Sequence, residues 1–148
     1  MKISFGDYVK KVDVSVLVAQ AVFNQLAKEF PLVPICEIAE TTSGGTPSRS
    51  NSNYYNGNIP WIKSGELNDG LITEVEENIS EEGLKNSSAK VYPKGTLVIA
   101  LYGATAGKVG ILNLDAASNQ AVCAIFPKEK ISRDFLFWFL RQYRYNFI

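Results

Sequence analysis

Apolar residues recur at intervals of three and four along the first thirty positions of the chain. This spacing places them on one face of a helix and predicts an amphipathic helix from about Tyr8 to Glu29. Pro31 ends that helix, because proline lacks the backbone N–H and clashes with the preceding turn. The apolar positions are Val9, Val12, Val16, Ala19, Phe23, Leu26 and Phe30.

Beyond Pro31 the pattern changes to short apolar runs separated by polar turns, which is typical of strands. Thr41–Asn58 is rich in Gly, Ser, Asn and Pro and predicts a long polar loop. Alternation along Leu71–Glu76 predicts a half-exposed strand, and the continuous run Leu97–Leu101 a central one. The other predicted strands are Ile59–Lys63, Lys108–Leu114 and Ala121–Phe126.

Two further helices follow from local signals. Ser80–Leu84 predicts a single turn, and Ser132 is placed to cap a C-terminal helix that has Asp134 in its first turn. Residues 135–140 are all apolar, so this helix is expected to be buried on every side or to await a partner. The elements predict an α+β fold, with an antiparallel or mixed sheet and flanking helices at both termini.

Charge gives no global argument for a nucleic-acid partner, because fifteen Lys and Arg balance fifteen Asp and Glu. The distribution is uneven: Glu37–Glu82 is mostly acidic, whereas Lys85–Lys108 contains four lysines and no acid. A basic face and an ordinary solvated charge pattern explain this equally well.

The sequence gives little support for a catalytic function. The chain contains no histidine, which removes the commonest general base and metal ligand. Gly103–Lys108 resembles a phosphate-binding loop, but three residues separate its glycines and Val109 follows the lysine, so a tight turn between strands is predicted. The carboxylates of Glu74, Glu76 and Glu77 are expected on a solvated strand without a basic neighbour.

Three polar or aromatic groups have a binding interpretation and a structural one. Ser43–Pro47, the first part of the Ser43–Ser48 motif, fits an anion nest or, preferably, a plain surface loop. The side-chain amides of Asn119 and Gln120 are suited to a bidentate contact with adenine N6 and N7 in the major groove. Amides at the start of a strand, however, more often form hydrogen bonds with nearby backbone groups. Tyr54, Tyr55 and Trp61 can stack on bases, although aromatic residues beside a strand are usually core.

The chain is expected to be cytoplasmic. Val14–Phe23 resembles the core of a signal peptide, but Asp7 and Asp13 do not fit a positive leader, and the run is too short to span a membrane. Cys36 and Cys123 lack CxxC spacing and are expected to be small buried residues in a reducing compartment.

Several short motifs follow one another along the chain in a characteristic order. The motifs are Ile38 with Thr46-Pro47-Ser48, Gly57-Asn58-Ile59-Pro60-Trp61-Ile62, Glu66-Leu67, Ile79 with Gly83-Leu84, Pro93-Lys94-Gly95-Thr96, Gly103 with Gly107-Lys108-Val109-Gly110-Ile111, and Ser118-Asn119-Gln120. Taken in this order, the set resembles the target recognition domain of a type I restriction–modification specificity subunit, over about Leu32–Tyr145. Under this resemblance, residues 1–31 form a separate N-terminal helix, and residues 32–148 form a single domain equal to half of a full subunit.

The resemblance implies a curved sheet, similar to the recognition domains of adenine-N6 DNA methyltransferases, that grips one half of a bipartite double-stranded DNA target. It implies no catalysis and no cofactor. Methyltransferase (M) and restriction (R) subunits would be the partners, and a half-subunit could pair with its own copy through the terminal helices.

The resemblance also locates candidate DNA contacts. Family members read different targets with shared motifs, so the base readers are expected in four less characteristic segments: 49–53, 63–69, 85–90 and 102–105. Arg49 and Lys63 are expected to contact guanine, and Lys94 and Lys108 to contact phosphate. The complete candidate set is Thr46, Ser48, Arg49, Lys63, Lys85, Lys90, Lys94, Tyr102, Thr105 and Lys108.

Two other functions remain open from the residues alone. A protein-interaction or glycan-binding module would use Tyr54, Tyr55 and Trp61 as an aromatic platform. A fragment of a DNA adenine methyltransferase would need an Asn/Asp-Pro-Pro-Tyr/Phe element and a glycine-rich AdoMet loop, and the sequence has neither.

Overall fold

The structure, a computed structural model, describes residues 14–144 in two compact units that divide between Val33 and Pro34. The first unit contains helix α2, Val14–Glu29. This helix ends where the sequence predicts, two residues before Pro31. The predicted first turns, residues 8–13, lie outside the described residues.

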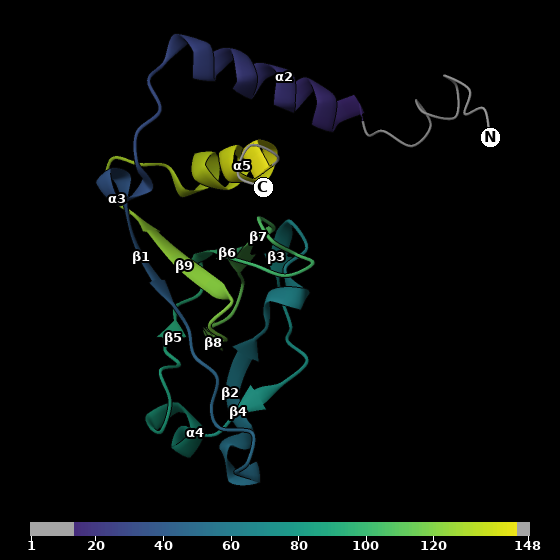
Figure 1. The fold of residues 1–148 in the computed structure, drawn as a ribbon, viewed down its shortest axis with the longest axis vertical. Coiled ribbons are helices and arrows are strands. Elements are labelled where there is room, and N and C mark those ends of the chain that lie inside the picture. The colour runs from purple at the N-terminus through teal and green to yellow at the C-terminus, as the bar shows by residue number, and fades with distance from the viewer. Residues whose placement is uncertain (1–13, 145–148) are drawn as a thin grey trace, which may run out of the picture. The chain divides into compact units, whose positions relative to one another are not determined.

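The second unit contains two mixed β-sheets (Figure 1). Sheet one has the order β1-β9-β6-β7-β3, in which only the β3–β7 pair is parallel; sheet two has the order β4-β2-β8-β5, in which only the β2–β8 pair is parallel. The α+β prediction is confirmed, with two sheets in place of one. The strands are β1 Ala39–Ser43, β2 Tyr55–Ile62, β3 Gly70–Ile72, β4 Asn78–Ile79, β5 Val91–Tyr92, β6 Leu97–Ala100, β7 Val109–Leu112, β8 Ala116–Ser118 and β9 Val122–Pro127.

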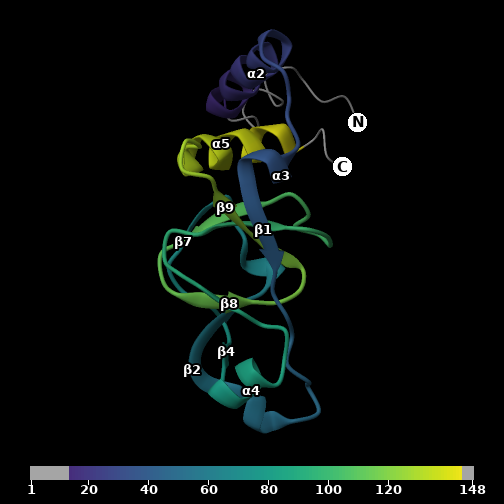
Figure 2. The same ribbon diagram turned by 90° about the vertical axis from the view of Figure 1, so that its left-hand side faces the viewer.

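Short helices lie between the strands, and the predicted helical turn after Ser80 and the predicted cap at Ser132 are both confirmed. In α4, Glu81–Lys85, the Ser80 hydroxyl accepts from the Gly83 N–H at 3.0 Å. In α5, Arg133–Tyr143, the Ser132 hydroxyl accepts from the Phe135 N–H at 3.2 Å. Figure 2 shows α5 and α4 at opposite ends of the second unit. The remaining helices are α3 Ile35–Ile38, η1 Ser52–Tyr54 and η2 Ser64–Glu66.

Sheet one is buried on both faces, which explains the continuous apolar run of β6. Leu97 packs with the buried residues of α5, and its neighbour Val98 packs into the core on the other face. The helix itself is amphipathic: Leu136 and Leu140 are buried, whereas Trp138 is 46% exposed. The prediction that α5 is buried on every side is therefore wrong, and the alternative, a partner for its exposed face, stays a prediction.

Several strand boundaries differ from the prediction because backbone geometry overrides polarity. The predicted loop Thr41–Asn58 is wrong at both ends, since its first residues belong to β1 and its last to β2. Asn56 adopts a left-handed φ of 56°, and the β2–β4 register shifts there, so a bulge carries the strand through polar residues. The predicted strand Leu71–Glu76 ends at Ile72.

Two predictions about environment have mixed outcomes. Both described cysteines are free thiols; Cys123 is half-buried, but Cys36 is exposed, so the expected burial is wrong there. Between residues 14 and 144, no helix has the length and apolar character that a bilayer crossing requires.

Candidate nucleic-acid interface

Gly44 and Gly45 of the Ser43–Ser48 motif lie at a buried crossing point with the backbone of Ser118 and Val122. The Gly44 N–H donates to the Val122 carbonyl at 3.2 Å, and the Gly45 N–H donates to the Ser118 carbonyl at 2.8 Å. A Cβ on Gly44 would stand 2.6 Å from the Ser118 carbonyl carbon, so the backbones approach too closely for any side chain. Both N–H groups are occupied within the fold, which disfavours the anion nest. The prediction of a plain surface loop is wrong for the two buried glycines, whereas Ser43 and Thr46 are exposed.

An aromatic pair supports the next part of this loop. Trp61 is 1% exposed and its indole N–H donates to the Gly45 carbonyl at 3.0 Å. Tyr55 meets Trp61 edge to face at 6.2 Å between ring centroids, and its hydroxyl donates to the Pro47 carbonyl. Burial raises the pKa of Tyr55. The core interpretation is confirmed for Trp61, and its face is not available for base stacking.

Arg49 lies on this aromatic pair and is held by an acid. Its guanidinium carbon is 4.2 Å from the Tyr55 ring centroid and 5.2 Å from that of Trp61. The Nη1 and Nη2 groups donate to the two carboxylate oxygens of Glu77, the second at 3.0 Å. These hydrogen bonds raise the pKa of Arg49 and lower that of Glu77.

Lys63, at the end of β2, joins the same group. Its Nζ is 2.9 Å from a carboxylate oxygen of Glu76 and 3.7 Å from one of Glu77. Its hydrogen bond to Glu76 raises the pKa of Lys63. The prediction that Glu76 and Glu77 lie on a strand without basic neighbours is therefore wrong. We call the four residues Arg49, Lys63, Glu76 and Glu77 the ion-pair cluster.

Glu66 fixes the backbone around this cluster. Its carboxylate accepts from the backbone N–H of Lys63 at 2.6 Å and from that of Glu76 at 2.8 Å. One side chain thus ties the end of β2 to the segment before β4. No group of three or more Cys, Asp or Glu within residues 14–144 is arranged to hold a metal ion.

The loop between β6 and β7 adjoins this region. The Thr105 hydroxyl donates to the Ser64 carbonyl in η2 at 2.8 Å. Gly103 and Gly107 have φ of 88° and 75°, which confirms the predicted tight turn with left-handed glycines. Tyr102, before the first glycine, is 52% exposed.

The structure brings some of the ten candidate residues together and separates others. Arg49, Lys63 and Thr105 form a continuous series through Glu77 and Ser64, and Tyr102 shares the loop of Thr105.

The other candidates have separate surroundings. The Lys90 Nζ donates to the Thr42 hydroxyl at 2.8 Å. Thr46 donates to the Gln120 side chain, and the hydroxyls of Ser48 and Ser50 are 2.8 Å apart. Lys94 is exposed in the β5–β6 turn and Lys108 is half-buried. For all ten residues, DNA contact remains a prediction.

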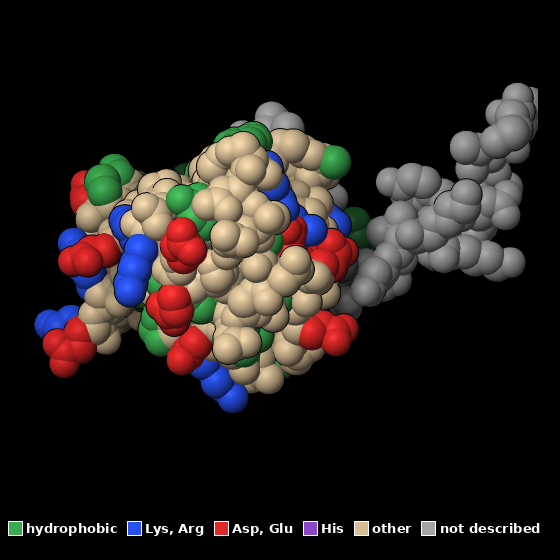
Figure 3. All heavy atoms as spheres, turned by 90° about the horizontal axis from the view of Figure 1, so that it is seen from below, with side chains coloured by type: hydrophobic (Ala, Val, Ile, Leu, Met, Phe, Trp, Pro, Cys, Tyr) green, Lys and Arg blue, Asp and Glu red, His purple; other side chains and the backbone are tan. Residues whose placement is uncertain are grey.

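Sequence reasoning missed the acids of this region. Glu66, Glu76 and Glu77 act through contacts with residues that lie up to 28 positions away. The available signal was the scarcity of bases: Arg49 and Lys63 are the only two in the acidic stretch from Glu37 to Glu82. Figure 3 shows acidic and basic side chains interspersed on the face seen from below, so this face is not uniformly basic.

Asn119 and Asp69 serve the fold. The Asn119 carboxamide oxygen accepts from the Ala121 N–H at 3.1 Å, as the structural interpretation expected. Asp69 has a left-handed φ of 66°, and its Oδ1 accepts from the Val109 N–H at 3.1 Å. The loop after η2 is therefore attached to the start of β7.

Comparison with protein families identifies the chain. Residues 27–147 match the model for the type I restriction modification DNA specificity domain. The chain is 30% identical over 121 residues to the type I restriction enzyme MjaIX specificity subunit of Methanocaldococcus jannaschii, covering 80% of this chain and 28% of that protein. It is 32% identical over 99 residues to the EcoR124I/EcoR124II specificity subunit of Escherichia coli, covering 64% and 24%.

Solved structures show the same fold. The crystal structure of the HsdS subunit from Thermoanaerobacter tengcongensis superposes with a TM-score of 0.60 at 19% identity, over 95% of this chain and 38% of that one. The S subunit from M. genitalium gives a TM-score of 0.52 at 14% identity, over 89% and 38%. The chain thus spans about a quarter of the length of the curated relatives it matches.

Proposed function

The chain belongs to the type I restriction modification DNA specificity domain family, and from that membership we propose that it reads one half of a bipartite double-stranded DNA target. A domain of this family supplies DNA sequence specificity and is non-catalytic by itself. The proposal adds which loops meet the DNA and what they contact.

We assign base reading to three segments: 49–53, 63–69 and 102–105. The carrying observation is the continuous series from Arg49 through Lys63 to Thr105, three side chains from segments far apart in the sequence. Lys63 directly follows β2, Arg49 lies on the ring of buried Trp61, and Thr105 is hydrogen-bonded to η2. Such attachment provides the fixed geometry that recognition of base edges requires. Exposed Tyr102 and half-exposed Lys63 provide donors at this surface.

Lysines outside these segments are assigned to the DNA backbone. Lys85, Lys90 and Lys94 are exposed, and Lys108 is half-buried at the end of the β6–β7 loop. A phosphate contact needs only a cation within reach and carries no sequence information. Ser48 would donate its hydroxyl to phosphate when Ser50 is the donor in their mutual hydrogen bond, whereas Thr46 would have to exchange its hydrogen bond to Gln120 for one to phosphate.

The assembly around the domain belongs to the same proposal. We infer methyltransferase and restriction subunits as partners in the cytoplasm, since the matched relatives are specificity subunits of type I restriction enzymes. We also infer that copies of the chain associate through their terminal helices, because the apolar residues Leu17, Val18 and Val22 of α2 are exposed. The oligomeric state of the chain in solution, measured by light scattering, tests it: a monomer at micromolar concentration would contradict it.

The rival β-module function loses its physical basis. An aromatic platform for glycans or peptides needs exposed ring faces, but Trp61 is buried, and the face of Tyr55 is covered by Arg49. The remaining ring, Tyr54, is half-buried.

Selection of bound duplexes from a random pool tests the proposal. The chain is assembled with its methyltransferase partner, because a single half-site reader lacks the avidity of a complete subunit. Enrichment of one short sequence on one side of a spacer is the expected result. A pool that stays unenriched, at a salt concentration where the complex binds DNA, would contradict it.

A further inference from the structure

Two acids face the two cations that are assigned to base reading. Glu77 holds Arg49 through both terminal nitrogens, and Glu76 and Glu77 lie within 4 Å of the Lys63 ammonium. The ion-pair cluster therefore has two positive and two negative charges, so its net charge is zero. A DNA-binding surface would be expected to leave such cations free for phosphate.

Only some N–H groups of Arg49 remain open for a hydrogen bond to DNA. Its guanidinium has five N–H groups, and the Glu77 carboxylate takes one from each terminal nitrogen. Tyr55 and Trp61 lie 4.2 and 5.2 Å from its central carbon. The end-on fork that would clasp a phosphate is thus occupied, while the Nε edge and the outer N–H groups stay open to a base edge.

The Glu76 and Glu77 carboxylates are not needed to hold their own segment in place. Its backbone is attached by other groups: the Glu77 carbonyl accepts from the Trp61 N–H at 3.0 Å, and the Glu76 N–H donates to Glu66 at 2.8 Å. One partner of each pair is well exposed, Glu76 at 72% and Arg49 at 55%, whereas Lys63 and Glu77 are 32% and 22% exposed. Solvent screening at the exposed partner keeps the contribution of such pairs to stability small.

We propose that Glu76 and Glu77 are specificity-determining residues that keep Arg49 and Lys63 from contributing to non-specific DNA binding. Non-specific affinity comes from cations that neutralise phosphates and release counterions. A cation that a protein carboxylate already neutralises releases no counterion and so adds nothing to the non-specific affinity. A phosphate that approaches this cation also approaches the carboxylate, which repels it. Base edges are uncharged acceptors, so the correct sequence binds the open N–H groups without displacing the pair. This inference rests on the proposed DNA-reading function.

The test measures the affinity of the full chain, assembled with its methyltransferase partner, for a random-sequence duplex at several salt concentrations. Glu76→Gln with Glu77→Gln keeps the side-chain size and removes both charges. The slope of log affinity against log salt is expected to steepen by about 0.9 for each freed cation, so by about 1.8 in the double variant. Random-duplex affinity at low salt should rise by roughly ten-fold, and the ratio of specific to random binding should fall.

The chain offers a matched control. Glu74→Gln removes the same charge from the same segment, and Glu74 is exposed and forms no ion pair within residues 14–144. Glu74→Gln should change the slope of log affinity against log salt much less than Glu76→Gln or Glu77→Gln alone. An equal effect of Glu74→Gln would overturn the proposal, since overall charge would then explain the gain.

A second variant separates electrostatics from misfolding. Adding Arg49→Gln to Glu77→Gln removes the freed cation, and the slope should return to the wild-type value. A slope unchanged by Glu76→Gln with Glu77→Gln would overturn the proposal while leaving DNA reading intact, provided that the wild type still enriches a sequence. A wild-type complex that binds no duplex at any salt concentration would overturn both.

Discussion

Arg144, at the C-terminal end of α5, donates a 2.6 Å hydrogen bond from Nη2 to Oδ2 of Asp69, seventy-five residues earlier in the chain. Both side chains are mostly buried, with 14% and 17% exposed. Asp69 also binds the start of β7, and a Cβ on Gly107 would stand 2.6 Å from the Arg144 side chain. The end of α5 is therefore packed against two loops to which we assign base reading.

Removal of Arg144 should destabilise the domain. Arg144→Gln leaves the Asp69 carboxylate mostly buried without its cation, and we expect the free energy of unfolding to fall by about 2 kcal/mol, because an unpaired buried charge is costly. Asp69→Asn should cost at least as much, because it leaves the mostly buried Arg144 cation without its counter-charge, even though asparagine tolerates the left-handed φ. Urea denaturation measures both. A loss of stability from Asp69→Asn well below that from Arg144→Gln would contradict this account.

The Gly44–Gly45 crossing should not tolerate a side chain. Gly45→Ala would place a Cβ 2.5 Å from the Ala89 nitrogen, within a stretch of backbone that has no room to move. We expect a loss of about 3 kcal/mol or more in the free energy of unfolding, as for other overpacked sites. Gly65→Ala is the control, because a Cβ there meets nothing within 4 Å and the residue lies in η2; its thermal midpoint should stay the same or rise slightly. Equal thermal midpoints for Gly45→Ala and Gly65→Ala would contradict the claim that the backbone at Gly45 leaves no room for a side chain.

The hydrogen bond between Thr105 and Ser64 should matter more for recognition than for stability. Thr105→Val keeps the shape and removes the hydroxyl, and we expect a stability loss of about 1 kcal/mol. The two loops would then lose their direct link, so the selected DNA sequence should become degenerate at one or more positions. Thr73→Val, at an exposed position after β3, is the control for the substitution. Selection of the same sequence by the Thr105→Val variant would show that the link does not position the loops.

Acid should weaken the ion-pair cluster. Hydrogen bonding to Arg49, with the charge of Lys63 nearby, lowers the pKa of Glu77 from its ordinary 4.5. A carboxyl with a lowered folded-state pKa stabilises the protein above the unfolded-state value, and this contribution is lost as the pH falls through the folded-state value. Wild type should therefore exceed Glu77→Gln in stability at pH 7, by about 1 kcal/mol or less because Arg49 is half exposed. The gap should close below about pH 4.5; thermal midpoints from pH 7 to pH 3 measure it, and a constant gap would contradict the assignment.

Local signals made much of the fold predictable. Ser80 and Ser132 have the side chains that cap helices, and both helices begin there. The conformations of β6 and of the glycines at 103 and 107 likewise depend on only a few neighbouring residues. Strand β6 is a continuous apolar run, and each of the two glycines has a positive φ. Short strands such as β4 and β5, with two residues each, have no sequence period to detect.

The candidate site was less predictable, because its contacts join distant residues. Sequence identified Arg49 and Lys63 as rare bases in an acidic stretch, but their pairing with Glu77 and Glu76 depends on how β2 and the segment before β4 meet. The Ser43–Ser48 motif was polar enough to suggest a surface loop. The burial of its two glycines follows from the close approach of Gly44 to Ser118, which the polarity of the sequence does not reveal.

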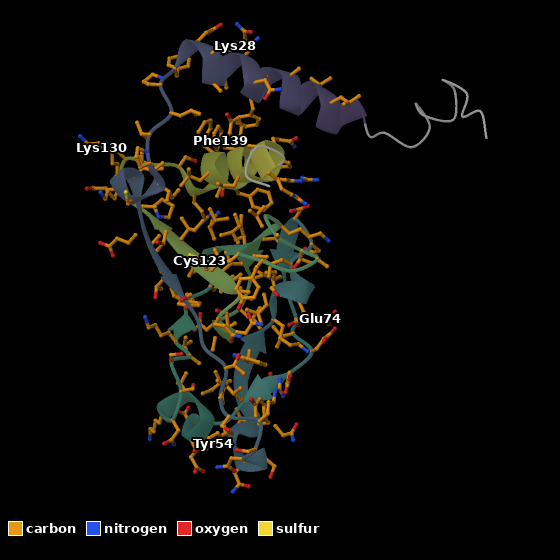
Figure 4. All side chains as sticks on the ribbon, in the orientation of Figure 1. Lys28, Tyr54, Glu74, Cys123, Lys130 and Phe139 are labelled. Atoms are coloured by element: carbon orange, nitrogen blue, oxygen red, sulfur yellow. The ribbon has the colours of Figure 1, made fainter. Side chains whose placement is uncertain are left out.

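Selection from a random duplex pool by the assembled complex tests the central claim most directly, when wild type is compared with Lys63→Ala and Lys130→Ala. Lys63 lies in the proposed reading surface, whereas Lys130 is exposed and lies beside α3 (Figure 4). We predict that wild type and the Lys130→Ala variant enrich the same half-site, and that the Lys63→Ala variant loses preference at one or two of its positions. Identical half-sites from all three proteins would contradict the assignment of the 63–69 loop to base reading.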